Sequence, residues 1–192
     1  MFEQPSATYK WNSGALMVRL ARTIIVGLLA LGASATRAET LSGDIVSISD
    51  GDTLTLLVGR KQHRIRIAGI DAPEHFQPHG NRSRSNLSRY AYRRDARAEC
   101  YKKDIYGRDV CKVWVKPFDC SNCGKSVDVG LAQVSDGMAW WDRNHASEQS
   151  DEDRGRYQSA ETMAKLRGFG LWRNAKPVPP WAWRHSFPRG SE

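Results

Sequence analysis

Residues 54–67 read Leu54-Thr-Leu-Leu-Val-Gly-Arg-Lys-Gln-His-Arg-Ile-Arg-Ile67, a pattern typical of a β-hairpin. Hydrophobic and polar residues alternate on both sides of Gly59-Arg60, as in two half-buried strands joined by a tight turn. In the second strand Ile65 and Ile67 alternate with arginines, which places Arg66 on the face opposite the isoleucines. The segment therefore predicts paired strands that present arginine on one face.

Further strands are expected on both sides of this hairpin. Upstream, the hydrophobic residues of 45–48 lead into the turn Asp50-Gly-Asp52, where we expect Gly51 to take a positive φ. Downstream, strands at about 96–102 and 109–115 flank the turn Asp104-Ile-Tyr-Gly-Arg108. Five strands in total are consistent with a small closed barrel.

Helices are expected mainly in the second half of the chain. A short one is predicted at about 82–94, and a second one follows from the spacing of Val127, Leu131 and Val134. The last begins at Ser150, which forms a capping box with Asp153. We expect the proline-rich tail 177–183 not to form regular helix and its tryptophans to pack on the domain. The predicted fold class is α+β: an OB-fold, with a five-stranded Greek-key barrel and about three helices.

The N-terminus has the pattern of a secretory signal peptide. Arg19 and Arg22 precede the apolar run 24–33, and small residues follow up to Ala38. A retained anchor or a buried helix are the alternatives. We expect 1–38 to be an N-terminal extension with a signal peptide, 39–185 the folded domain and 186–192 a disordered tail. The expected location is secreted or periplasmic, without stable membrane association after cleavage.

The net charge is positive, at +8 for 192 residues. Without residues 1–38 the chain keeps 25 basic and 20 acidic residues, a net charge of +5. This balance favours polyanionic partners such as nucleic acids, although a solvated basic surface has the same composition.

Charged residues gather beside the predicted turns and strand ends. Such a set suits phosphodiester hydrolysis: carboxylates such as Asp52 and Asp71 can bind a hard cation, and the planar guanidinium of arginine matches phosphate oxygens. Glu74 could orient or deprotonate an attacking water. The alternative is that these residues are ordinary surface turns, because sequence spacing does not establish that they meet.

The motifs resemble those of the staphylococcal nuclease homologues in the same order. They are Asp50-Gly-Asp-Thr53, Ile65-Arg-Ile-Ala-Gly-Ile-Asp-Ala-Pro-Glu74, Asp104-Ile-Tyr-Gly-Arg108 and Gly170-Leu-Trp172. The resemblance covers about residues 41–184 and implies an OB-fold nuclease of DNA and RNA that uses calcium and leaves 3′-phosphates. Two carboxylates alone would also suit magnesium or manganese.

The resemblance also implies roles for individual residues. Asp52, Asp71 and the carbonyl of Ala72 become calcium ligands, although Ala72 replaces the threonine of the type enzyme. The catalytic residues implied are Arg66, Glu74 and Arg108. Tyr106 is expected beside the phosphate or packed in its turn.

The base-stacking tyrosines of the type enzyme have no clear counterparts in this sequence. Trp141 is the candidate for stacking on bases, although core packing is the alternative for it or for Trp140.

Four cysteines behind an export signal favour two disulfides. Cys100 and Cys111 are symmetric about the turn 104–108, so directly opposed positions on the two strands predict a Cys100–Cys111 bond. A local Cys120–Cys123 bond is predicted in the loop that follows. The alternatives are a four-cysteine zinc site and a redox-active pair.

Two other functions are compatible with such a domain. One is a catalytically silent OB-fold module that only binds nucleic acid; the other is a structural or adhesion domain. Neither explains why Asp52, Arg66, Asp71, Glu74 and Arg108 are all present. A monomer is the default expectation.

Overall fold

The computed structural model describes residues 1, 39–120 and 122–186. The predicted signal peptide and the tail after Ser186 lie outside the described residues. The strands are β1 (Glu39–Ile48), β2 (Thr53–Val58), β3 (Lys61–Ile67), β4 (Ile70–Asp71), β5 (Asp95–Lys103), β6 (Asp109–Val115), β7 (Val127–Asp128) and β8 (Trp140–Trp141). The helices are α2 (Gly80–Ala91), α3 (Val129–Ser135), α4 (Asp151–Leu166) and α5 (Pro180–Ser186), with 3₁₀ helices η1 (Arg143–Glu148) and η2 (Gly170–Arg173).

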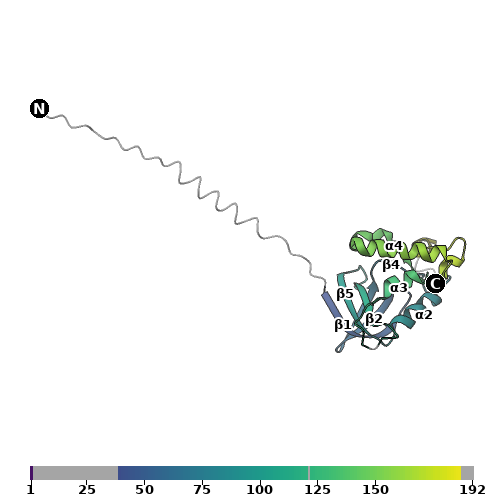
Figure 1. Cartoon of the computed structure of the whole chain (residues 1–192), viewed down its shortest axis with the longest axis horizontal. Helices are drawn as coiled ribbons and strands as arrows, with labels where there is room; N and C mark the ends of the chain where they lie inside the picture. The colour runs from purple at the N-terminus through teal and green to yellow at the C-terminus, as the bar shows by residue number, and fades with distance from the viewer. Residues whose placement is uncertain (2–38, 121, 187–192) are drawn as a thin grey trace. The chain divides into compact units, whose positions relative to one another are not determined.

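Five strands close into a barrel in the order β3-β2-β1-β5-β6 (Figure 1). Neighbouring strands in this order are antiparallel, and a parallel pairing of β3 with β6 closes the ring. Ile65 pairs with Leu54 across the predicted hairpin and with Asp109 across the closure. The barrel and its helices confirm the predicted α+β fold class.

The barrel core consists of the alternating apolar residues seen in the sequence. One face of each strand is buried, because successive side chains of a strand point to opposite sides. A register shift between Ile45 and Ser47 gives β1 a bulge, a feature that helps a sheet to curve. The fully buried side chains include Ile45, Leu54, Leu56, Ile65, Ile67, Ala96, Ala98 and Val113.

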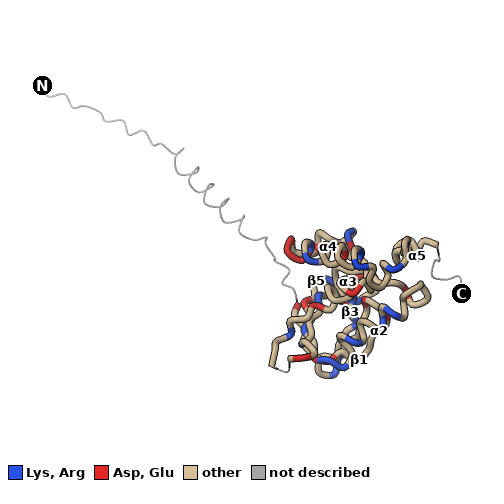
Figure 2. Tube along the Cα trace, turned by 45° about the vertical axis from the view of Figure 1, so that its right-hand side comes forward, with Lys and Arg blue, Asp and Glu red and all other residues tan. Residues whose placement is uncertain are grey.

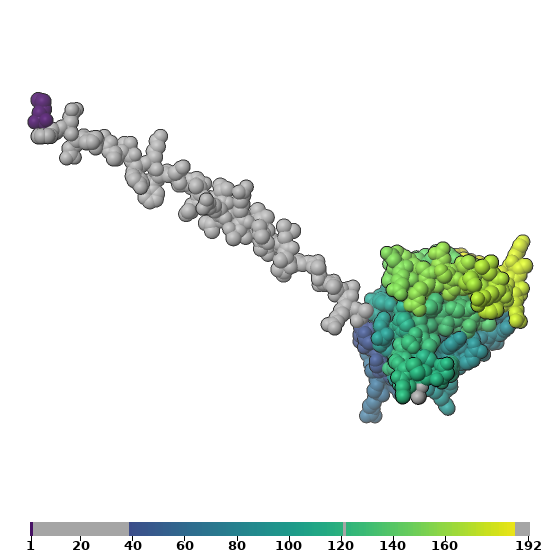
Figure 3. Space-filling view, in the orientation of Figure 1, coloured from purple at the N-terminus to yellow at the C-terminus, as the bar shows by residue number. Residues whose placement is uncertain are grey.

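The C-terminal helices form a layer over one side of the barrel, shown in green to yellow in Figure 3. Tyr157 of α4 is buried and donates to both carboxylate oxygens of Asp128, at 3.0 Å each. Asp128 also caps α3 by accepting from the amides of Gly130 and Leu131. Ser150 caps α4 as predicted by accepting from the amide of Asp153. None of the described helices combines the length and apolar character needed to cross a membrane.

Some element boundaries differ from those expected from the sequence. Val127 lies in β7 and not in a helix, because Asp128 ends the strand pairing and begins α3 as its cap. Helix α2 spans Gly80–Ala91 and not 82–94, since Arg93 takes a positive φ of 59°.

The proline-rich tail was predicted wrongly, because it contains the helix α5. Pro180 is the first residue of that helix, where the missing amide hydrogen of proline is not needed. Trp181 contacts Trp140 edge to face at a centroid distance of 6.3 Å, so this tryptophan does pack on the domain. Ser186, assigned to the tail, is the last residue of α5.

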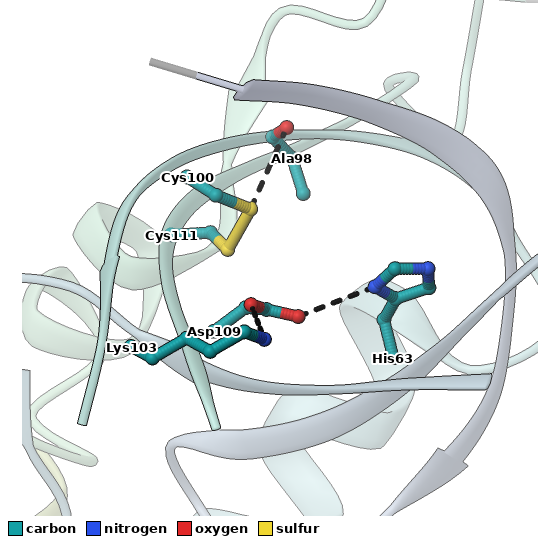
Figure 4. The surroundings of a disulfide bond; sticks show 6 residues. All are labelled: His63, Ala98, Cys100, Lys103, Asp109 and Cys111. Carbon is teal, nitrogen blue, oxygen red and sulfur yellow. Dashed lines mark hydrogen bonds and ion pairs between the residues drawn. A yellow bond between two sulfur atoms is a disulfide. The ribbon is translucent and has the colours of Figure 1, made fainter. Parts of the chain in front are cut away.

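Both predicted disulfides are present, Cys100–Cys111 and Cys120–Cys123, and they engage all four cysteines. Cys100 and Cys111 are directly opposed on β5 and β6, with Cα atoms 4.0 Å apart. Figure 4 shows Asp109 beside this bond, between Lys103 and His63. The disulfide therefore braces the hairpin that carries the turn 104–108, close to the point where β6 also pairs with β3.

Candidate active site

A cavity of about 460 Å³ brings together seven of the eight residues predicted to bind metal, act on the phosphate or bind substrate. They are Asp52, Arg66, Asp71, Ala72, Glu74, Tyr106 and Arg108. Asp50, Pro73 and Arg184 also line the cavity and had no predicted role. Figure 2 shows acidic and basic positions close to one another around β3 and α3, with α5 near the C-terminal edge of the domain. The fold therefore brings these charged residues together, and they are not separate residues of surface turns.

Asp52, directly before β2, accepts two hydrogen bonds and forms an ion pair with Arg66. Its Oδ2 accepts from the amide of Ala72 at 2.9 Å and lies 2.7 Å from Nη1 of Arg66, and its Oδ1 accepts from Thr53 at 3.0 Å. Burial raises the pKa of Asp52, but the charge of Arg66 and these hydrogen bonds outweigh burial, so the pKa lies below its usual value. Asp52 is therefore an ionised carboxylate at neutral pH.

Asp71 reaches the same cavity from β4. This short strand pairs with β8, where Asp71 is opposite Trp140. The carboxylate is 5% exposed, and its Oδ1 lies 3.5 Å from Nη2 of Arg66. The guanidinium of Arg66 thus contacts both Asp52 and Asp71. The fold therefore brings together two carboxylates that are nineteen positions apart in the sequence. Burial raises the pKa of Asp71, while hydrogen bonds from Arg184 oppose that shift.

Asp50 lies in the turn between β1 and β2 and adds a third aspartate to the cavity lining. Its Oδ1 accepts from the amide of Asp52 at 3.0 Å. Burial, together with the nearby charge of Asp52, raises the pKa of Asp50 to about 7. Asp50 is therefore protonated in a large fraction of molecules at neutral pH, unlike Asp52.

The β1–β2 turn is fixed by α3 and α2 and not by the conformational freedom of glycine. Gln133 of α3 is fully buried and donates to the carbonyl of Gly51 at 2.7 Å. The φ of Gly51 is not positive, so that expectation was wrong. Glycine is required for space, because a Cβ there would lie 1.9 Å from Oγ of Ser83 and 2.7 Å from Cβ of Ala72.

Replacing Gly51 with alanine is therefore expected to lower the free energy of unfolding by about 1–3 kcal/mol through overpacking. Urea unfolding followed by circular dichroism measures the change. The matched control is Gly155→Ala in α4, where an added Cβ meets no atom within 4 Å. That control should instead be more stable by about 0.5–1 kcal/mol, because alanine favours helix over glycine. Equal stability of Gly51→Ala and the unaltered protein would contradict the packing argument.

Arg66 lies in β3 and Arg108 in the turn between β5 and β6, and both side chains line the cavity. Nη1 of Arg66 is buried and lies 2.7 Å from Oδ2 of Asp52, while Nη2 lies 3.5 Å from Oδ1 of Asp71. Arg108 is held by Asp104, with Nε 2.6 Å from Oδ2, and its Nη1 donates to Thr53 at 3.2 Å. Asp104 also accepts from the amide of Arg108, so the whole turn orients this side chain. Both guanidinium groups line the cavity, and their planar N–H donors suit phosphate oxygens.

Tyr106 and Glu74 lie at the more open side of the cavity. Tyr106 is exposed, and the guanidinium of Arg108 lies 5.4 Å from its ring centre. Glu74 follows β4, and its amide donates to the side chain of Gln77 at 3.1 Å. Its side chain is 26% exposed and accepts from Arg184 at 2.9 Å. Glu74 is therefore placed where both the cavity and solvent can reach it.

The structure does not place Trp141 at the cavity. Its indole is buried in the core, where the ring nitrogen donates to Gln149 at 2.8 Å. Trp140 is also buried, against Trp172 and Trp181. Both side chains are held by packing because β8 pairs with β4 beneath α4, so Trp141 is not proposed as a substrate-binding residue.

A hard cation fits the oxygen donors of the cavity. Asp52, Asp71 and the carbonyl of Ala72 would offer oxygen atoms, the type of ligand that Ca²⁺ prefers. Among the described residues, no three or more His, Cys, Asp or Glu side chains are grouped as a metal site. An ion held here would therefore complete its coordination with backbone carbonyl, water or substrate oxygens, which Ca²⁺ accepts.

Sequence reasoning missed Arg184, which donates to both oxygens of Asp71 and to Glu74. It is separated from Asp71 by 113 positions, and no spacing pattern links it to the other motifs. Asp50 could have been identified as a candidate site residue from the sequence, because it belongs to the Asp50-Gly-Asp-Thr53 motif.

Comparison with known proteins agrees with this arrangement. The family model described as "Staphylococcal nuclease homologue" matches residues 64–174. "Protein ParB" of Escherichia coli is 36% identical over 168 residues, covering 88% of this chain and 90% of that protein. The "Uncharacterized endonuclease" of Haemophilus influenzae is 34% identical, covering 79% and 77%, and the "Micrococcal nuclease" of Shigella flexneri is 32% identical, covering 75% and 80%. This chain belongs to the staphylococcal nuclease homologue family.

Proposed function

We propose that this protein is an exported endonuclease that hydrolyses phosphodiester bonds of DNA and RNA with a bound calcium ion and leaves 3′-phosphates. The observation that carries the proposal is that one cavity is lined by a common set of charged side chains. They are Asp52, Asp71, Glu74, Arg66 and Arg108. The names of the nuclease relatives support it, and so does the chemistry of each side chain.

Asp52, Asp71 and the carbonyl of Ala72 would hold the cation. When bound, the ion supplies positive charge next to a phosphate oxygen and withdraws electron density from phosphorus. The donor set does not by itself distinguish calcium from magnesium or manganese. The family resemblance favours calcium, and the metals are compared in the experiment below.

Arg66 and Arg108 would neutralise the phosphate as negative charge builds in the transition state. Guanidinium groups bind phosphate oxygens through two parallel N–H donors, and both arginines line the cavity. Asp104 and Thr53 hold Arg108 at the other side. Tyr106 would lie beside the bound phosphate, next to Arg108.

Glu74 would orient and deprotonate the attacking water. The water oxygen forms a bond to phosphorus, its proton moves to the Glu74 carboxylate, and the bond from phosphorus to the 5′-oxygen breaks. The leaving 5′-oxygen takes up a proton, and the phosphate stays on the 3′-oxygen of the other fragment. One water is consumed for each bond that is cut.

Export is proposed from residues 1–38, with cleavage after Ala35 or Ala38 and release as a monomer free of the membrane. The two disulfides support an oxidising compartment, where such bonds persist.

The proposal predicts calcium-dependent cleavage by protein recovered from the periplasm or the medium. The new N-terminus is read by mass spectrometry, and single-stranded DNA, duplex DNA and RNA are then incubated with calcium, with magnesium or manganese, and with a chelator. We expect an N-terminus near residue 39, cleavage with calcium and none with chelator. Tight binding without cleavage in any of the three metals would favour the silent OB-fold module instead.

A further inference from the structure

Arg184 lies across the acidic end of the proposed active site. Its Nη2 donates to Oδ2 of Asp71 at 2.8 Å, and its Nη1 donates to Oδ1 of Asp71 at 3.2 Å and to Glu74 at 2.9 Å. One guanidinium therefore engages both oxygens of a proposed metal ligand and one oxygen of the proposed base. These contacts raise the pKa of Arg184 further above its usual value, so the side chain is a permanent cation.

The segment that carries Arg184 is anchored to the loop after β4. The carbonyl of Val178 accepts from the side chain of Gln77 at 2.7 Å, and Gln77 in turn accepts from the amide of Glu74. Asn174 contacts His79 at 3.1 Å, where α2 begins. Trp181 contacts Trp140, which is buried and pairs directly with Asp71 between β4 and β8. Residues 174–181 thus hold α5 at the mouth of the cavity.

The guanidinium of Arg184 and a divalent cation would use the same oxygens of Asp71. Both carboxylate oxygens already accept from Arg184, and Oδ1 also lies near Arg66. A divalent ion bound to Asp71 would also lie close to the charge of Arg184, and like charges repel strongly in a partly buried site. Arg184 and the cation therefore compete for Asp71.

We propose that Arg184 is an intramolecular latch that competes with the catalytic cation for Asp71 and sets the cation affinity of the site. The latch rests on the function proposed above, because it needs a cation that binds at Asp71. Binding of the cation displaces Arg184 and loosens α5, and by linkage a closed α5 weakens cation binding to the same extent.

Two opposing effects set the strength of the latch. The fork contacts are charge-assisted hydrogen bonds, but the Arg184 side chain is 40% exposed, so water and salt weaken them. If the open form is about a tenth of the population, the apparent cation affinity is reduced roughly tenfold, because affinity scales with the competent fraction.

Calcium titration by isothermal calorimetry tests the latch in the full-length protein. Arg184→Met removes the guanidinium while keeping an unbranched side chain, and we expect its calcium dissociation constant to fall roughly tenfold. The matched control is Arg173→Met, which removes the same charge from η2 away from the cavity lining and should leave the constant unchanged. Asp71→Asn should abolish the binding heat and so assigns it to this site.

Hydrogen exchange separates a latch from a simple charge effect, since removing any nearby positive charge favours a cation. Amides of residues 181–186 should exchange several-fold faster with calcium than without it in the unaltered protein. In Asp71→Asn, calcium should leave this exchange unchanged. These readouts do not require turnover.

The outcomes separate the latch from the function on which it rests. Unchanged calcium affinity in Arg184→Met, or tighter binding without faster exchange in α5, overturns the latch and leaves the proposed metal site intact. Absence of calcium, magnesium and manganese binding in the unaltered protein and in Arg184→Met overturns both. Tighter binding together with calcium-dependent exchange in α5 is the expected result.

Discussion

Glu74→Gln is expected to lower kcat by about 10²- to 10⁴-fold, the usual contribution of a general base. Glutamine has the same shape and still accepts a hydrogen bond, so the contact with Arg184 persists, but the amide does not take up a proton from water. The loss should therefore fall on turnover and not on binding. Cleavage of a labelled oligonucleotide with calcium measures kcat, and fluorescence anisotropy measures affinity.

Two comparisons make the Glu74 result interpretable. Glu152→Gln changes the same chemical group in the exposed first turn of α4 and should keep full activity. Unchanged oligonucleotide affinity and unchanged urea unfolding in Glu74→Gln would show that the site and fold are intact. A kcat within a few-fold of the unaltered protein would remove Glu74 from the role of base.

Removing the Cys100–Cys111 bond is expected to lower the free energy of unfolding more than removing the Cys120–Cys123 bond. The bond closes a loop with a sequence separation of 11, and the chain-entropy relation gives about 3 kcal/mol for a loop of that size. Both residues are buried, and Cys111 also pairs with Ile67 where the barrel closes. The double variant Cys100→Ala, Cys111→Ala should therefore unfold at a distinctly lower urea concentration.

The second disulfide is the matched control for this experiment. Cys120–Cys123 has a sequence separation of only 3, so the same relation gives about 2 kcal/mol or less for its removal. Its loop lies between β6 and β7 and does not line the cavity. We expect the Cys100–Cys111 variant to lose more stability and also activity, because the braced hairpin carries Arg108. Equal losses in both variants would argue against a special role for the brace.

Much of the barrel could be predicted because its signals are local. The β2–β3 hairpin follows from alternation around Gly59-Arg60, and the observed register pairs Val58 with Lys61. The Cys100–Cys111 pairing follows from the symmetry of two strands about one turn. Period-two burial and short turns depend on neighbouring residues only, so a sequence pattern is sufficient to identify them.

Other features could not be predicted because the competing local signals were misleading. The prolines at 177, 179 and 180 argued against helix, yet Pro180 begins α5. Two adjacent tryptophans near the motifs suggested base stacking, yet pairing of β8 with β4 buries both. In each case a tertiary contact decides between two states that the local sequence allows.

By itself, the sequence determined the strand pattern, the cysteine pairing and the identity of five of the seven charged residues that line the cavity. Only the tertiary structure decided that Arg66 contacts both Asp52 and Asp71, and that Arg184 lies across Asp71 and Glu74. The physical reason is distance along the chain. Alternation and turns act over a few residues, whereas barrel closure by β3 and β6 and the docking of α5 join segments through burial and charge that no local pattern encodes.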